Sequence, residues 1–98
     1  MFGLEAEDIE TIKKVLYKFP EVEKAFVFGS RALGNYKKGS DVDIALIAKD
    51  DIAESVTRIS YKLNEESYLP YYFDIVEYRA IENTELKQHI DEHGIRII

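Results

Sequence analysis

Apolar residues recur along this chain with two different spacings, and the spacing predicts which segments are helices and which are strands. Apolar positions every three or four residues predict amphipathic helices at 7–19, 50–65 and 81–93. Short apolar and aromatic runs predict buried strands at 25–28, 42–48 and 71–76. The resulting order is helix, strand, strand, helix, strand, helix, which is typical of a small protein that packs helices on a sheet.

The links between the strands predict how the sheet is connected. The Gly-rich segment 29–40 is marginally short for a helical crossover, so we expect an antiparallel pair with a loop that has room for one helical turn after Ser30. The helix at 50–65 is long enough to cross over to the third strand. The prediction is a small α/β fold, a mixed β-sheet with helices packed on it, in a single domain spanning 1–98.

Residues that begin or end helices mark the element boundaries. Pro20 ends the first helix, Asp50 and Asp51 can cap the second, and Gly94 is a favourable residue just after the third. The apolar tail Ile95–Ile98 is unusual at a chain end, and we expect it to pair into the sheet or an interface.

Composition excludes several classes of function. The sequence has 98 residues, a net charge of -6 and no cysteine. The lack of cysteine excludes disulfides, thiolate metal sites and thiol nucleophiles, and the acidic balance disfavours nonspecific nucleic-acid binding. No apolar run approaches the roughly 20 residues of a membrane-spanning helix, and residues 1–10 lack the basic and apolar regions of a signal peptide. We therefore expect a cytoplasmic protein with no membrane and no direct nucleic-acid contact.

Asp41 and Asp43 are the first candidates for chemistry. Two residues apart on a strand, their side chains leave the same face, with Cα atoms roughly 6.5–7 Å apart. Adjacent carboxylates repel each other unless a cation lies between them, and Mg²⁺ is bound by one or two carboxylates together with substrate phosphates. The alternative is that Asp41 caps a turn and Asp43 is a solvated strand residue.

A second candidate lies just after the first strand. Gly29 allows the backbone to approach a ligand closely, and a helical turn after Ser30 would point free amides toward phosphate oxygens. The Ser30 hydroxyl can donate a hydrogen bond, and Arg31, Lys37 and Lys38 can supply positive charge. The alternative for this segment is a plain Gly-rich hairpin.

Asp74 is the third candidate, because an Asp flanked by apolar strand residues has poor strand propensity. If the third strand lies beside the second, Asp74 can join Asp41 and Asp43. The alternative is an Asp at a strand edge that faces solvent.

Together these residues resemble a known family signature. Gly29 and Ser30, ten intervening residues and Asp41-Val42-Asp43 are similar to the Gly-Ser-x10-Asp-x-Asp pattern of the polymerase-β-like nucleotidyltransferases. The short length and the Gly-Ser-Arg-Ala-Leu-Gly opening look like the minimal nucleotidyltransferase (MNT) group. The resemblance covers nearly the whole chain.

The resemblance implies roles for the candidate residues. Asp41, Asp43 and Asp74 would be catalytic metal ligands for two Mg²⁺ ions, with Asp41 and Asp43 bridging the metals and the nucleotide phosphates. Asp74 would hold the metal that activates the acceptor hydroxyl. Gly29 and Ser30 would cradle the β- and γ-phosphates of ATP.

The resemblance also implies a partner and a reaction. MNT proteins are commonly partners of HEPN-domain toxins, and the implied activity is transfer of AMP from ATP to a tyrosine of the toxin, which makes the protein an antitoxin. A homodimer is a further possibility. One alternative is a nucleotidyltransferase fold that neutralises or scaffolds a partner without turnover. Another is transfer to a small molecule or RNA with the help of a partner subunit.

Two weaker features involve aromatic and histidine side chains. Tyr68, Tyr71 and Tyr72 could stack on adenine or contact a partner, but packing around a turn is the favoured interpretation. His89 and His93 have a spacing that can bind Zn²⁺, but we interpret them as surface residues because no Glu follows His89 directly.

Overall fold

The sheet of the computed structural model, which describes residues 1–98, has four strands in the order β3-β2-β1-β4. Strand β1 (Lys24–Phe28) pairs antiparallel with β2 (Val42–Ile47), and β2 pairs parallel with β3 (Phe73–Glu77). The two-residue strand β4 (Ile95–Arg96) runs antiparallel to β1. The antiparallel first pair, the parallel crossover and the mixed sheet are therefore confirmed.

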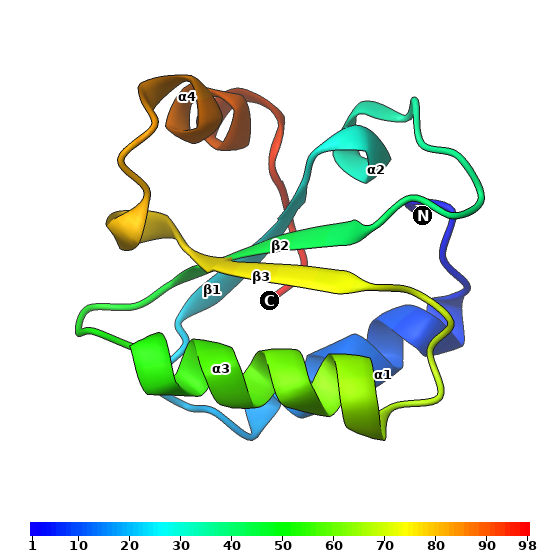
Figure 1. Cartoon of the computed structure of the whole chain (residues 1–98), viewed down its shortest axis with the longest axis horizontal. Helices are drawn as coiled ribbons and strands as arrows, with labels where there is room; N and C mark the ends of the chain where they lie inside the picture. Colours follow the sequence, from blue (N-terminus) through cyan, green and yellow to red (C-terminus); the bar gives the residue numbers. More distant parts are fainter.

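The helices cover the two faces of this sheet unequally (Figure 1). Helices α1 (Ala6–Tyr17) and α3 (Ala53–Tyr61) lie on one face, and α4 (Thr84–His93) lies on the other. The single turn α2 (Ser30–Leu33) follows β1 at one end of the sheet, as the sequence predicts. No helix of this fold is both long and apolar enough to cross a membrane.

Local sequence explains where the helices begin. The Asp51 carboxylate accepts a hydrogen bond from the Ala53 amide, the first of α3, at 2.9 Å, although the N-cap residue itself is Ile52. The predicted start of the last helix at 81 is wrong by three residues, because the Asn83 side chain accepts from the Leu86 amide at 3.1 Å and sets the first turn there. Shorter segments extend two elements: a π-helical turn at Lys62–Glu66 follows α3, and a 3₁₀ turn at Tyr78–Ala80 follows β3.

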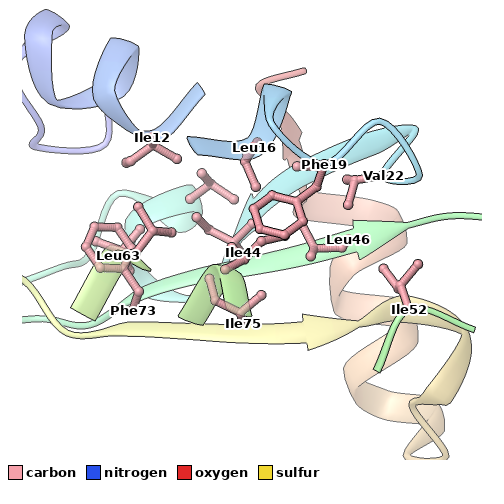
Figure 2. Close-up of a cluster of buried hydrophobic side chains, with 14 of the residues drawn as sticks. Ile12, Leu16, Phe19, Val22, Ile44, Leu46, Ile52, Leu63, Phe73 and Ile75 are labelled. Carbon is pink, nitrogen blue, oxygen red and sulfur yellow. The ribbon is translucent and has the colours of Figure 1, made fainter. Parts of the chain in front are cut away.

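The main hydrophobic core lies between the sheet and the layer formed by α1 and α3 (Figure 2). Val42, Ile44 and Leu46 alternate along β2 toward this layer, as their period-two spacing predicts, and all three are fully buried. They meet fully buried side chains from the other elements, namely Ile12, Leu16, Ile59, Leu63 and Phe73. Burying one such side chain stabilises the fold by about 1.5–3 kcal/mol.

The opposite face of the sheet carries a much smaller apolar cluster. Phe28, Ala45 and Ile90 are its buried members, so α4 packs on β1 and β2 through few side chains. Because side chains alternate along a strand, Asp43 and Asp74 lie on this face and not in the main core. The alternation therefore places both carboxylates on the face of the sheet that α4 covers.

The C-terminal tail completes the sheet, as expected. Ile95 and Arg96 pair with Val27 and Phe26 of β1, and the Ile97 amide donates to the Ala25 carbonyl at 2.9 Å. The tail therefore makes β4 the neighbour of β1 on the side away from β2.

Candidate active site

Three carboxylates predicted from the sequence lie at the same end of the sheet. Asp43 and Asp74 are direct partners in the parallel register of β2 and β3, so the condition for Asp74 to join the pair is met. Asp41 lies two residues before Asp43, immediately ahead of β2, and both Asp41 and Asp74 are exposed. Asp74 is also on an edge strand, which leaves one side of this carboxylate group open to solvent.

The pKa of Asp43 reflects the concentration of negative charge at this end of the sheet. Burial, followed by the charges of Asp74 and Asp41, raises the pKa of Asp43 to about 6, while the charge of Arg31 opposes the rise. A carboxylate under this combination of burial and like charge is stabilised when a cation binds beside it. The donor set therefore fits a hard divalent cation such as Mg²⁺.

The chain does not form a closed metal cage by itself. No three His, Asp or Glu side chains converge on one point, so any ion bound here would need other oxygen ligands. Mg²⁺ is commonly held in this way, by one or two carboxylates together with water and substrate phosphates. The carboxylates that could hold it are Asp41, Asp43 and Asp74.

Gly29 is required by the geometry next to Asp43. It follows Phe28, whose register partner across β1 and β2 is Asp43. Its backbone has φ 72° and ψ -153°, a conformation that other residues adopt only with strain, and a Cβ here would overlap Asp43 Oδ2. Ser30 follows as the first residue of α2. Gly29 therefore lies directly against the Asp43 carboxylate, and Ser30 is the next residue in the chain.

The Arg31 side chain is buried, whereas the sequence predicts a charge that is available to phosphates. Its side chain is 3% exposed, and its guanidinium donates two hydrogen bonds to the Ser40 carbonyl, at 2.8 and 3.2 Å, and one to the Phe2 carbonyl at 2.8 Å. The rings of Tyr36 and Tyr71 lie 5.2 and 5.0 Å from it. The guanidinium is therefore committed to backbone carbonyls, and its contact with nucleotide stays a prediction. Arg31 fixes the loop just before Asp41.

Lys37 and Lys38 remain available in the loop that Arg31 holds. Both are exposed, and neither ammonium group forms an ion pair. The Lys37 amide donates to the Ser40 hydroxyl at 2.8 Å, which orders the tip of the loop. Their contact with nucleotide stays a prediction.

His89 is a residue of the site that sequence reasoning missed. It is half-buried, and its Nε2 accepts a hydrogen bond from the Gly29 amide at 2.8 Å, so its interpretation as a surface residue is wrong. The two residues are 60 positions apart, and no local pattern predicts such a contact. His93 is exposed, as expected.

The tyrosines near the third strand divide into packed and exposed residues. Tyr71 is half-buried, its hydroxyl donates to the Asp8 carboxylate at 3.3 Å, and its ring meets Phe73 edge-on. The packing interpretation is therefore confirmed for Tyr71. Tyr68 and Tyr72 are exposed and free to contact another molecule.

A separate hollow of about 380 Å³ lies at the opposite end of the sheet and is lined mainly by acidic and polar residues, including Glu21, Glu23 and Asp50. None of the candidate residues lines it. The carboxylates and the Gly-Ser turn instead form an open end of the sheet.

Comparison with known proteins agrees with this geometry. The family model described as Polymerase beta, Nucleotidyltransferase matches residues 10–98. The search among curated proteins found no match. Among solved structures, a chain of a toxin–antitoxin complex with AMP-PNP is 27% identical, with a TM-score of 0.77, over 93% of this chain and 73% of that one.

Two further structures share the fold at 24% identity. In a complex of tri-AMPylated Shewanella oneidensis HEPN toxin with MNT antitoxin, the TM-score is 0.73, over 97% of this chain and 72% of that one. In the toxin–antitoxin complex MntA–HepT it is 0.72, over 96% and 72%. Since the family model spans nearly the whole chain, the protein belongs to the polymerase β nucleotidyltransferase family.

Proposed function

We propose that this protein is a Mg²⁺-dependent adenylyltransferase that transfers AMP from ATP to a tyrosine of a HEPN-domain toxin and so acts as its antitoxin. The observation that carries the proposal is the group of carboxylates, Asp41, Asp43 and Asp74, beside the Gly29–Ser30 turn. Family membership supports nucleotidyl transfer. The toxin–antitoxin complexes of the same fold, one with AMP-PNP and one with an AMPylated toxin, support the nucleotide and the partner.

The three carboxylates would act on the two sides of the phosphorus at which transfer occurs. Asp41 and Asp43 would hold Mg²⁺ on the triphosphate side, and Asp74 would hold it on the acceptor side. Bound Mg²⁺ supplies positive charge that stabilises the attacking and leaving oxygens. Gly29 has no side chain, so the backbone can approach the β- and γ-phosphates, and the Ser30 hydroxyl can donate to them.

The proposed transfer needs no reactant other than ATP and the acceptor tyrosine. The tyrosine oxygen forms a bond to the α-phosphorus as the bond from that phosphorus to the bridging oxygen breaks, and pyrophosphate leaves with the electron pair. The phenolic proton passes to a carboxylate oxygen of Asp74, which is exposed on the acceptor side. The products are an AMP-tyrosine and pyrophosphate.

The open end of the sheet suits a protein acceptor. Asp74 is exposed on the edge strand β3, and the exposed side chain of Tyr72 lies just before that strand. A tyrosine presented on the surface of another protein could approach from this side without a deep pocket. This arrangement supports a macromolecular acceptor more than a small molecule.

The direct test uses ATP radiolabelled at the α-phosphate. We expect the purified protein, with Mg²⁺ and a cognate HEPN toxin, to label that partner, whereas ATP labelled at the γ-phosphate gives no label. Asp43→Asn should abolish the label, and Asp50→Asn, at the far end of the sheet, should not. If wild type and Asp43→Asn label the partner equally poorly and both still neutralise the toxin, the protein acts by binding alone and the proposed transfer is wrong.

A further inference from the structure

The hydrogen bond between His89 and Gly29 joins the last helix to the turn that precedes the carboxylates. His89 Nε2 accepts from the Gly29 amide at 2.8 Å, and no other side-chain hydrogen bond links α4 to β1 or α2. The contact uses the lone pair of Nε2, which leaves Nδ1 as the ring's donor nitrogen. This contact fixes both the position of the turn and the tautomer of His89.

The Gly29 residue is held from three sides. Its amide donates to His89, its carbonyl accepts from the Leu33 amide at 3.1 Å, and its Cα lies against the Asp43 carboxylate. The carbonyl contact is the first bond of α2, which begins at Ser30. These contacts therefore hold the backbone from which Ser30 and α2 begin.

Packing holds the imidazole in place for this task. The ring of Phe28 meets His89 edge-on, with centroids 6.2 Å apart and an interplanar angle of 71°. The next residue on α4, Ile90, is buried against Phe28 and Ala45. Since the same strand carries Phe28 and leads into Gly29, the helix and the turn are positioned as one unit.

We propose that His89 is a positioning residue of the nucleotide site, which holds the Gly29 amide so that Ser30 is oriented toward the triphosphate. The inference rests on the proposed nucleotidyl transfer. His89 acts through Gly29 and takes no part in bond making. Its loss should therefore weaken binding of Mg²⁺–ATP more than it slows the saturated reaction.

A matched pair of substitutions separates the hydrogen bond from the shape of the side chain. Gln and Met have similar length and volume, but only Gln provides a strong acceptor. We expect the Gly29 amide to stay protected from hydrogen exchange in His89→Gln. In His89→Met the same amide should exchange about 5- to 10-fold faster. The control, Gln88→Met, replaces the same kind of amide side chain by a thioether at an exposed neighbouring position on α4. It should leave the hydrogen-exchange rate of the Gly29 amide unchanged.

Kinetics with Mg²⁺–ATP give the functional readout. We expect His89→Met to raise the KM for ATP by about 10- to 100-fold, with a smaller change in kcat, and His89→Gln to stay near wild type. If His89→Met does not fold, His89→Phe keeps the aromatic contact with Phe28 and removes the acceptor. Equal Gly29 protection or equal KM in the Gln and Met variants would overturn the proposal.

The wild-type protein distinguishes failure of this proposal from failure of the proposed function. If wild type binds Mg²⁺–ATP and transfers AMP, and the variant without the acceptor does so equally well, only the positioning role is wrong. If wild type binds no Mg²⁺–ATP in a calorimetric titration, nucleotidyl transfer is wrong and the positioning role fails with it.

Discussion

The two faces of the sheet are built from the same strands, but they bury very different side chains. The face under α1 and α3 contributes to a cluster of 17 buried apolar residues, whereas the cluster under α4 has 3. The strand positions that continue this second face toward one end of the sheet are Asp43 and Asp74, which meet across β2 and β3. One face therefore supplies most of the apolar burial, and the other supplies the candidate site.

This division explains how the fold tolerates repelling charges. Asp43 is under the influence of burial and of two neighbouring carboxylates, which disfavours its ionised form. Such an arrangement costs stability, and the large apolar cluster on the opposite face offsets it. Removing the Asp43 carboxylate should therefore raise stability and lower activity, whereas truncating the large apolar cluster should lower stability.

The largest effect is expected for Asp43→Asn. Removing the central carboxylate should lower AMP transfer by about 10³-fold, since electrostatic groups aimed at the reacting atoms contribute at this scale. The same change should stabilise the metal-free protein by about 1 kcal/mol, after allowance for solvent screening of a partly exposed group. Radiolabel transfer and urea unfolding in EDTA measure the two quantities.

The stability gain of Asp43→Asn should depend on pH in a defined direction. Because the pKa of Asp43 is raised from 3.8 to about 6, the folded protein holds this proton more tightly than the unfolded chain. Wild-type stability should therefore fall, relative to Asp43→Asn, as the pH rises from about 4 through about 6. A constant difference across this range would contradict the charge argument.

Alanine substitutions of buried residues should show how much each face of the sheet contributes to stability. Ile44→Ala, at a fully buried position under α1 and α3, should cost about 2–5 kcal/mol. Ile90→Ala, in the small cluster under α4, should cost less because α4 can settle toward the sheet. Urea midpoints measure both, and equal losses would show that the two faces contribute alike.

Arg31→Lys tests the loop that leads into Asp41. A lysine cannot reproduce the paired contacts that the guanidinium makes with the Ser40 carbonyl, and it leaves the Phe2 carbonyl unpaired. We expect a loss of about 1–3 kcal/mol and faster proteolysis between residues 34 and 40. Proteolysis at the wild-type rate would show that the loop does not depend on this side chain.

The smallest effect is expected for the double substitution Lys37→Ser with Lys38→Ser. Both ammonium groups are exposed and unpaired, so their removal should leave stability within about 0.5 kcal/mol. If they meet the triphosphate, the KM for ATP should rise a few-fold at low salt, and the difference should shrink as salt increases. An unchanged KM at low salt would remove both lysines from the site.

The sequence predicted the elements and most of the carboxylate site because these depend on local spacing. Period-three and period-four patterns predict the helices, and period-two spacing predicts that Asp41 and Asp43 share a strand face. The structure places Asp43 in β2 and Asp41 immediately ahead of that strand. Gly29 can be identified from the sequence because a glycine directly after a strand permits a backbone that other residues avoid. The predicted start of the last helix at 81 is wrong, because a side-chain cap at Asn83 decides where α4 begins.

The contacts that only the tertiary structure decided join residues far apart in the chain. Arg31 is buried because three separate segments, at Phe2, Ser40 and Tyr71, surround it. The sequence shows only a basic residue near the Gly-Ser turn, whereas the structure shows that its guanidinium holds the loop before Asp41. His89 meets Gly29 because α4 packs back onto β1. Local patterns report the periodicity and conformational preference of neighbouring residues, whereas the partner of a buried polar group is set by how the elements pack.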